Sequence, residues 1–108
     1  MNIIYHKNLD LADWHAKGIS YQMANIGSEI SRTINWQKKN RMEHADLSFE
    51  RALELIDITV AGTKNYFRLK EILRMREMLV AWKIGDKYYE KNSDWLKYFD
   101  IFTANIRH

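Results

Sequence analysis

The sequence contains no cysteine and no proline, and only four of its 108 residues are glycine. Without cysteine, the chain can form neither a disulfide framework nor a metal site built on thiolates. Proline and glycine interrupt helices, so their scarcity favours long helices. No apolar run approaches the ~20 residues that span a bilayer, and the N-terminus lacks the pattern of a signal peptide. We therefore expect a cytoplasmic protein that does not enter a membrane.

The composition is that of a folded chain with one core. Hydrophobic residues make up 46% of the sequence and aromatic residues 13%, which is too much for a disordered segment. A chain of this length forms one domain, which we expect to cover residues 1–108. Lys and Arg number 17 against 14 Asp and Glu, a net charge of +3. The two signs alternate along much of the chain, which is typical of solvated helix faces.

Apolar residues recur with the period of an α-helix. The clearest run is Ile19, Met23, Ile26, Ile30 and Ile34, at steps of four, three, four and four residues. Similar runs predict helices over residues 20–39, 41–61, 63–84 and 93–106, after a lead-in over residues 1–18 that holds a short helix. Short connections force consecutive helices to run antiparallel. The expected fold is therefore all-α, an up-down-up-down four-helix bundle with a short N-terminal lead-in helix.

Individual residues are expected to begin, end or join these helices. Ser20 and Thr63 have side chains suited to N-caps, and Asn40 is expected to turn the chain. Gly62 is expected to adopt a positive φ angle at a helix C-terminus. Gly27 marks either a close approach of two helices or a tolerated defect.

Metal and nucleophile motifs are missing from the chain. A ferritin-like di-iron site needs a Glu three residues before a His on two helices. The residues three positions before His6, His15, His44 and His108 are Ile3, Ala12, Arg41 and Asn105. No Gly-x-Ser-x-Gly elbow and no glycine-rich phosphate loop occurs. We therefore expect no metal, no cofactor and no catalytic residue, although the sequence does not decide whether the protein is an enzyme.

Arg76 is the least expected residue in the predicted helical pattern. It lies among the apolar residues that were assigned to the inner face of the third long helix, which are Tyr66, Leu69, Ile72, Leu73, Leu79, Val80 and Ile84. A buried arginine needs a carboxylate partner, and its guanidinium favours a bidentate pair. The candidates are Asp46, Glu50 and Asp57 on the second helix and Glu29 on the first. This predicted cluster is either an internal ion pair that fixes helix register or a pocket for an anionic ligand.

A second apolar surface is predicted on the second long helix. Leu47, Leu55 and Ile58 project away from the stripe that contains Phe49. A helix that is apolar on two sides has two partners. The second partner could be the lead-in, the aromatic stretch Trp82-Tyr88-Tyr89, or another copy of the protein.

Two resemblances follow from particular segments. Residues 41–57 resemble the second helix of a tetratricopeptide repeat, because Ala45, Phe49 and Ala52 occupy the packing positions of that repeat. The chain holds no second copy at the expected ~34-residue period, so this likeness implies a helix pair rather than a peptide-binding solenoid.

Over nearly its whole length the chain also resembles a family of small uncharacterised bacterial four-helix proteins, chiefly through residues 25–32 and 49–57. The bundle is similar in size to the substrate-binding subunits of minimal nucleotidyltransferases and to HEPN-type ribonucleases. HEPN nucleases use an Arg-x(4–6)-His motif on a late helix. Here the late pair is Arg107–His108 without a spacer, which argues against nuclease activity.

These observations favour a non-enzymatic helical-bundle module for interaction or accessory roles. We expect it to self-associate as a homodimer or to bind another protein. The alternative is an accessory subunit of a nucleotidyltransferase-like partner, in which Arg76 and nearby cations bind a nucleotide or nucleic acid.

Overall fold

The computed structural model describes residues 2–85 and 91–106, and every regular element within them is a helix. The five helices are α1 (Leu11–Ala16), α2 (Ile19–Lys38), α3 (Met42–Gly62), α4 (Tyr66–Lys83) and α5 (Asn92–Ile106). The predicted all-α class is therefore confirmed, and each long helix begins and ends within three residues of its expected range. The late pair Arg107–His108 lies outside the described residues, as do Tyr88 and Tyr89 of the aromatic stretch.

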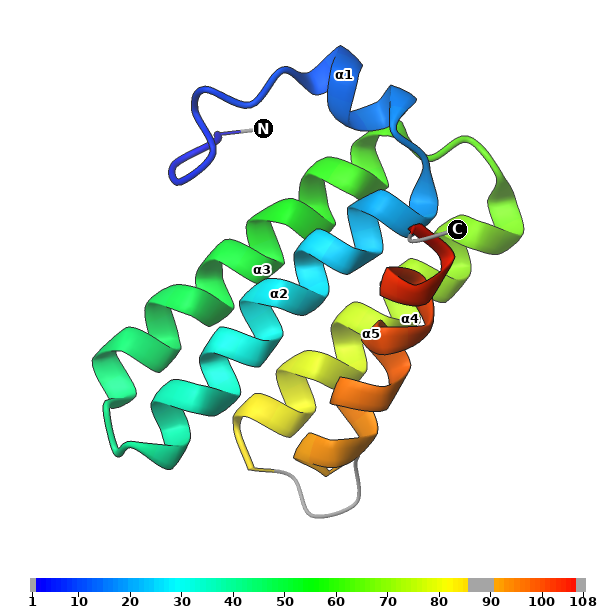
Figure 1. Ribbon diagram of the computed structural model, residues 1–108. Helices are drawn as coiled ribbons and strands as arrows, with labels where there is room; N and C mark the ends of the chain where they lie inside the picture. The colour runs from blue at the N-terminus through cyan, green and yellow to red at the C-terminus, as the bar shows by residue number, and fades with distance from the viewer. Residues whose placement is uncertain (1, 86–90, 107–108) are drawn as a thin grey trace.

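The long helices form a bundle in which α2 packs closely against both α3 and α5, while α4 packs against α3 (Figure 1). The lead-in and α1 lie across the end of the bundle where α2 begins and α3 ends. There the Trp14 indole nitrogen donates a hydrogen bond to the Thr59 hydroxyl at 3.1 Å, and Trp14 is buried. The lead-in is thus part of the core.

The ends of the helices differ in part from the predicted caps. Asn65, not Thr63, caps α4, because its side chain accepts a hydrogen bond from the Arg68 backbone at 3.0 Å. Thr63 instead ends α3, and its hydroxyl donates to the Thr59 carbonyl at 2.7 Å. Ser20 is not an N-cap, since α2 already begins after Gly18.

Asn40 lies in the connection between α2 and α3, and Gly62 lies where α3 ends. Asn40 turns the chain as predicted, with a φ angle of 56°. Gly62 lacks the positive φ angle that was expected. It is the last residue of α3, and a Cβ atom there would overlap the His15 imidazole ring. Because glycine has no side chain, His15 of α1 can approach the end of α3 closely at this position.

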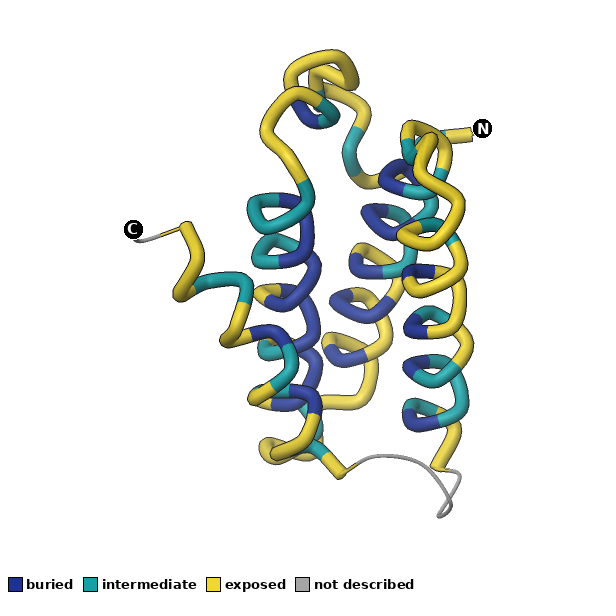
Figure 2. Tube along the Cα trace, turned by 90° about the vertical axis from the view of Figure 1, so that its right-hand side faces the viewer, coloured by how far each residue is buried: buried dark blue, intermediate teal, exposed yellow. Residues whose placement is uncertain are grey.

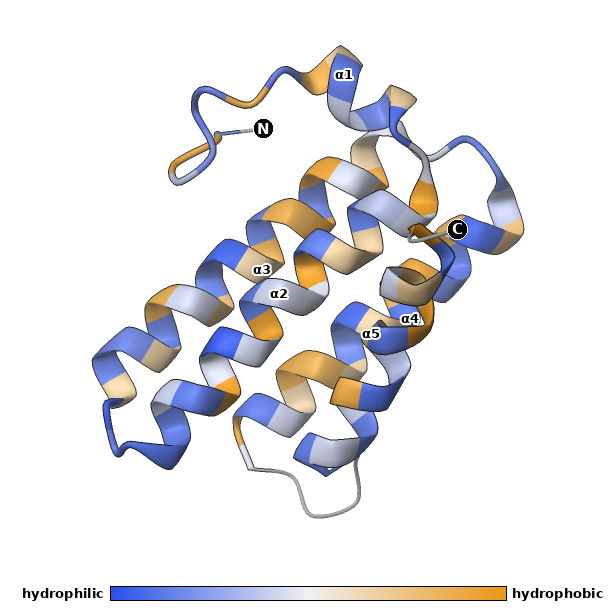
Figure 3. Ribbon diagram, viewed as in Figure 1, coloured by the Kyte–Doolittle hydropathy of each residue, from blue (hydrophilic) through white to orange (hydrophobic). Residues whose placement is uncertain are grey.

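The core runs along the facing sides of the four long helices, where buried residues follow the helical period (Figure 2). Hydrophobic residues recur along each long helix with hydrophilic residues between them (Figure 3). The predicted α2 stripe is buried from Met23 to Ile34, and Phe49 and Ile56 of α3 are buried with it. Met42, which was assigned to the same α3 stripe, is exposed.

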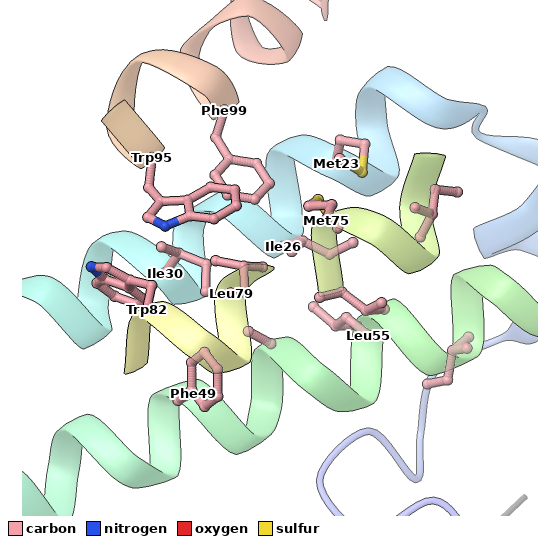
Figure 4. Close-up of a cluster of buried hydrophobic side chains, with 14 of the residues drawn as sticks. Met23, Ile26, Ile30, Phe49, Leu55, Met75, Leu79, Trp82, Trp95 and Phe99 are labelled. Atoms are coloured by element: carbon pink, nitrogen blue, oxygen red, sulfur yellow. The ribbon is translucent and has the colours of Figure 1, made fainter. Parts of the chain in front are cut away.

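The predicted inner side of α4 is only partly right: Ile72 and Leu79 are buried as expected, but Leu73 and Ile84 are exposed. Its buried side carries Ile72, Met75, Leu79 and Trp82, at steps of three, four and three residues. These side chains meet Ile26 and Ile30 of α2, Phe49 and Leu55 of α3, and Trp95 and Phe99 of α5 (Figure 4). Leu73, which the sequence placed inside, is 45% exposed. The thioether and indole side chains of Met75 and Trp82 are buried with Ile72 and Leu79, and Leu73 lies outside.

Candidate functional site

Arg76 lies at the edge of the core rather than inside it. Its Nε donates to Asp57 Oδ1 at 2.8 Å and its Nη2 to Asp57 Oδ2 at 3.3 Å, which is the bidentate arrangement expected. The two side chains are 35% and 44% exposed. The prediction of a buried charge is therefore wrong, because the helix is rotated so that water reaches the guanidinium.

Glu50 and Glu29, the other predicted members of this cluster, have different partners. Glu50 accepts a hydrogen bond from the Tyr5 hydroxyl of the lead-in. Glu29 lies on α2, where its Oε1 accepts from Arg32 one turn later at 2.6 Å. The structure thus brings only Asp57 to Arg76, and the interior charge cluster predicted from the sequence is not formed.

The predicted interface of Leu47, Leu55 and Ile58 is also not one surface. Leu47 is 42% exposed, whereas Leu55 and Ile58 are buried. Leu55 belongs to the central core (Figure 4), and Ile58 belongs to the same buried cluster as Trp14 of α1. Because residues of the chain itself bury two of the three side chains, they cannot receive a second molecule.

Glu54 forms a carboxylate site that the sequence did not indicate. Its two oxygens accept hydrogen bonds from the backbone nitrogens of Ile4, Tyr5 and His6 at 2.7 to 3.2 Å, and Oε1 lies 2.8 Å from His6 Nδ1. Burial raises the pKa of Glu54, but these hydrogen bonds outweigh burial and lower it to about 2. The site fastens the N-terminal segment to α3. It depends on the path of that segment, which no local pattern encodes.

The side of α4 next to α3 carries four of the residues that the sequence analysis placed in the interior. Leu69, Leu73, Val80 and Ile84 lie on this side, where Leu73 is 45% and Ile84 is 79% exposed. Beside them on α3 lie the half-buried Leu53 and Val60. We call these six residues, together with the ion pairs that join the two helices, the α3/α4 face.

Charges on the α3/α4 face are divided between its two helices. Asp46 and Asp57 come from α3, and their partners Lys83 and Arg76 come from α4. The Lys83 ammonium lies 2.6 Å from Asp46 Oδ1. The carboxylates therefore form one row, and the cations form a parallel row on the neighbouring helix.

On its other side, α4 borders a cavity of about 300 Å³ that is lined by residues of both α4 and α5. Met75, Met78, Trp95 and Tyr98 form most of the lining, and Glu71, Arg74 and Asp94 complete it. Burial, and secondarily the charge of Glu71, raise the pKa of Tyr98. The cavity is therefore apolar with charged groups beside it.

In residues 2–85 and 91–106, no group of three or more His, Asp or Glu side chains is placed to hold a metal ion. No described helix combines the length and the apolar character needed to cross a membrane. His44 is exposed, as expected, and stacks on Trp36 with ring centroids 4.4 Å apart.

Comparisons with protein-family models, with curated proteins and with solved structures found no significant match to this chain.

Proposed function

We propose that this protein is a non-enzymatic interaction module that pairs with a second copy of itself through the α3/α4 face. The observation that carries this proposal is the two-sided apolar character of α4. One side of the helix packs in the core, and the other leaves Leu73 and Ile84 exposed beside half-buried aliphatic residues. A helix with two apolar sides requires two partners, and the chain supplies only one of them within the described residues.

The arrangement of charge supports a second copy as the other partner. In a two-fold interface the same patch lies on both subunits, so residue i of one meets residue j of the other and the reverse. The α3/α4 face has carboxylates on one helix and cations on the next. Rotating a copy by 180° about an axis that lies in the interface and runs parallel to the helices places the acidic row of each subunit opposite the basic row of its partner. The face is therefore complementary to itself.

The alternative role as a nucleotidyltransferase accessory subunit gains no support from this geometry. That role requires Arg76 to contact a phosphate. Asp57 already binds the guanidinium with two hydrogen bonds, so an anion must displace a carboxylate that is held at 2.8 Å.

Sedimentation equilibrium over a concentration series tests the proposal. Leu73→Glu places a charge in the proposed interface, and we expect it to give a monomer where the wild type is a dimer. Leu47→Glu is the matched control, because Leu47 is 42% exposed against 45% for Leu73 but lies away from the α3/α4 face. We expect this control to remain dimeric. A monomeric wild type, or a dimer that only Leu47→Glu disrupts, contradicts the proposal.

A further inference from the structure

We propose that the cavity between α4 and α5 binds a small organic cation of the quaternary ammonium class. This site is independent of the α3/α4 face, because it lies on the other side of α4. Its volume of about 300 Å³ is at the lower end of the range for small-ligand pockets, about 300–1,000 Å³.

Two aromatic rings form a corner of the cavity. Trp95 and Tyr98 are three residues apart on α5, and their ring planes meet at 87° with centroids 5.7 Å apart. Met75 and Met78 supply polarisable thioethers on the α4 side. Aromatic rings in a cavity lining favour a methylated ammonium, because a ring face attracts a cation and the methyl groups pack against apolar walls.

The charges beside the corner favour a cation. Glu71 and Asp94 contribute two negative charges, and Arg74 contributes one positive charge. Elsewhere in the chain, Lys17, Lys39, Arg51, Lys70 and Lys83 each lie over an aromatic ring. Among the residues that the structure describes, no Lys or Arg lies over Trp95 or Tyr98.

The apolar lining selects a quaternary cation over a primary amine. A primary ammonium has three N–H donors, and each of them loses a water when it enters an apolar cavity. A quaternary ammonium has no donor to satisfy. The carboxylates of Glu71 and Asp94 then act at longer range, without direct hydrogen bonds to the ligand.

Binding of choline and of its uncharged carbon isostere 3,3-dimethylbutan-1-ol tests the proposal, followed by NMR of the isotope-labelled protein. The two probes have nearly the same shape and differ in charge. We expect choline to shift the signals of Trp95 and Tyr98 and to bind about threefold or more tightly than the alcohol, the effect of a cation–π contact. Equal affinities, or no saturable shift at these residues, overturn the proposal.

Charge variants give a result that a purely apolar cavity would not. Glu71→Gln removes a favourable charge and is expected to weaken choline binding, whereas Arg74→Gln removes a like charge and is expected to strengthen it. Glu77→Gln, an exposed change on α4 outside the cavity lining, is the control and is expected to leave choline affinity unchanged. Identical choline affinity in all three variants overturns the proposal. Binding of the alcohol should be the same in each.

Discussion

Gly27 of α2 lies directly against Phe99 of α5: a Cβ atom at position 27 would be 2.6 Å from the Phe99 Cβ and 2.8 Å from its Cγ. Gly27 therefore marks a close approach of two helices, one of the two roles expected of it.

This contact predicts that Gly27→Ala destabilises the fold. Alanine favours a helix over glycine by about 1 kcal/mol. The added methyl group must nevertheless push α5 away, and overpacking of this kind costs about 1–3 kcal/mol or more. We expect a net loss of unfolding free energy, measured by urea denaturation. Ser28→Ala, an exposed change one residue later, serves as the control and should be close to neutral. A more stable Gly27→Ala protein would show that the two helices can separate freely.

The Glu54 site predicts a specific dependence of stability on pH. Its pKa is about 2 in the folded protein, below the ordinary 4.5, so the folded state favours the ionised carboxylate. This stabilisation is complete above about pH 4.5 and is lost as the pH falls toward 2. Wild type should therefore exceed Glu54→Gln in stability near neutral pH, and the difference should shrink near about pH 3.

Urea unfolding of both proteins at the two pH values measures this difference. Glu43→Gln, an exposed change on the same helix, is the control for general acid effects. A difference between wild type and Glu54→Gln that stays constant with pH contradicts the account of this site.

Leu79 and Leu73 provide a direct test of how α4 is oriented. Leu79 is fully buried and Leu73 is 45% exposed. Leu79→Ala should therefore cost about 2–5 kcal/mol, whereas Leu73→Ala should cost less than about 1 kcal/mol in the monomer. Equal losses in the two variants, measured by denaturation of the monomer, would restore the orientation predicted from the sequence.

The Arg76–Asp57 pair is expected to add little to stability. Both side chains are more than one-third exposed, and exposed ion pairs are worth about 0–1 kcal/mol. A double-mutant cycle with Arg76→Met and Asp57→Asn isolates the coupling between them. A coupling well above 1 kcal/mol in about 0.15 M salt would mean that the pair fixes the register of the helices.

Much of the fold follows from the sequence because α2 and α5 each have one dominant apolar stripe. On α2, the isoleucines at positions 26, 30 and 34 leave only one side to bury. α4 differs, because apolar residues surround most of its circumference. Its period could not show whether Leu79 and Met75 or Leu73 and Val80 face inward. That choice depends on how the other helices fill the centre, which is a property of the whole bundle.

The prediction of the site residues also depended on which side of α4 faces inward. Once α4 is rotated, Arg76 reaches Asp57 at the surface, and neither Glu29 nor Glu50 is near enough to join the pair. Glu54 and the Trp95–Tyr98 corner were missed for another reason. Glu54 binds a segment distant in sequence, and the cavity beside the Trp95–Tyr98 corner exists only because α4 lies next to α5.

Distances between spin labels in the two subunits test the proposed α3/α4 pairing most directly. The chain has no cysteine, so Glu77→Cys on α4 and Ser28→Cys on α2 each provide a single exposed site for a label. In a dimer formed through the α3/α4 face, labels at position 77 should be much closer to each other than labels at position 28. A shorter distance at position 28, or no dipolar coupling between labels at either position, would contradict the account.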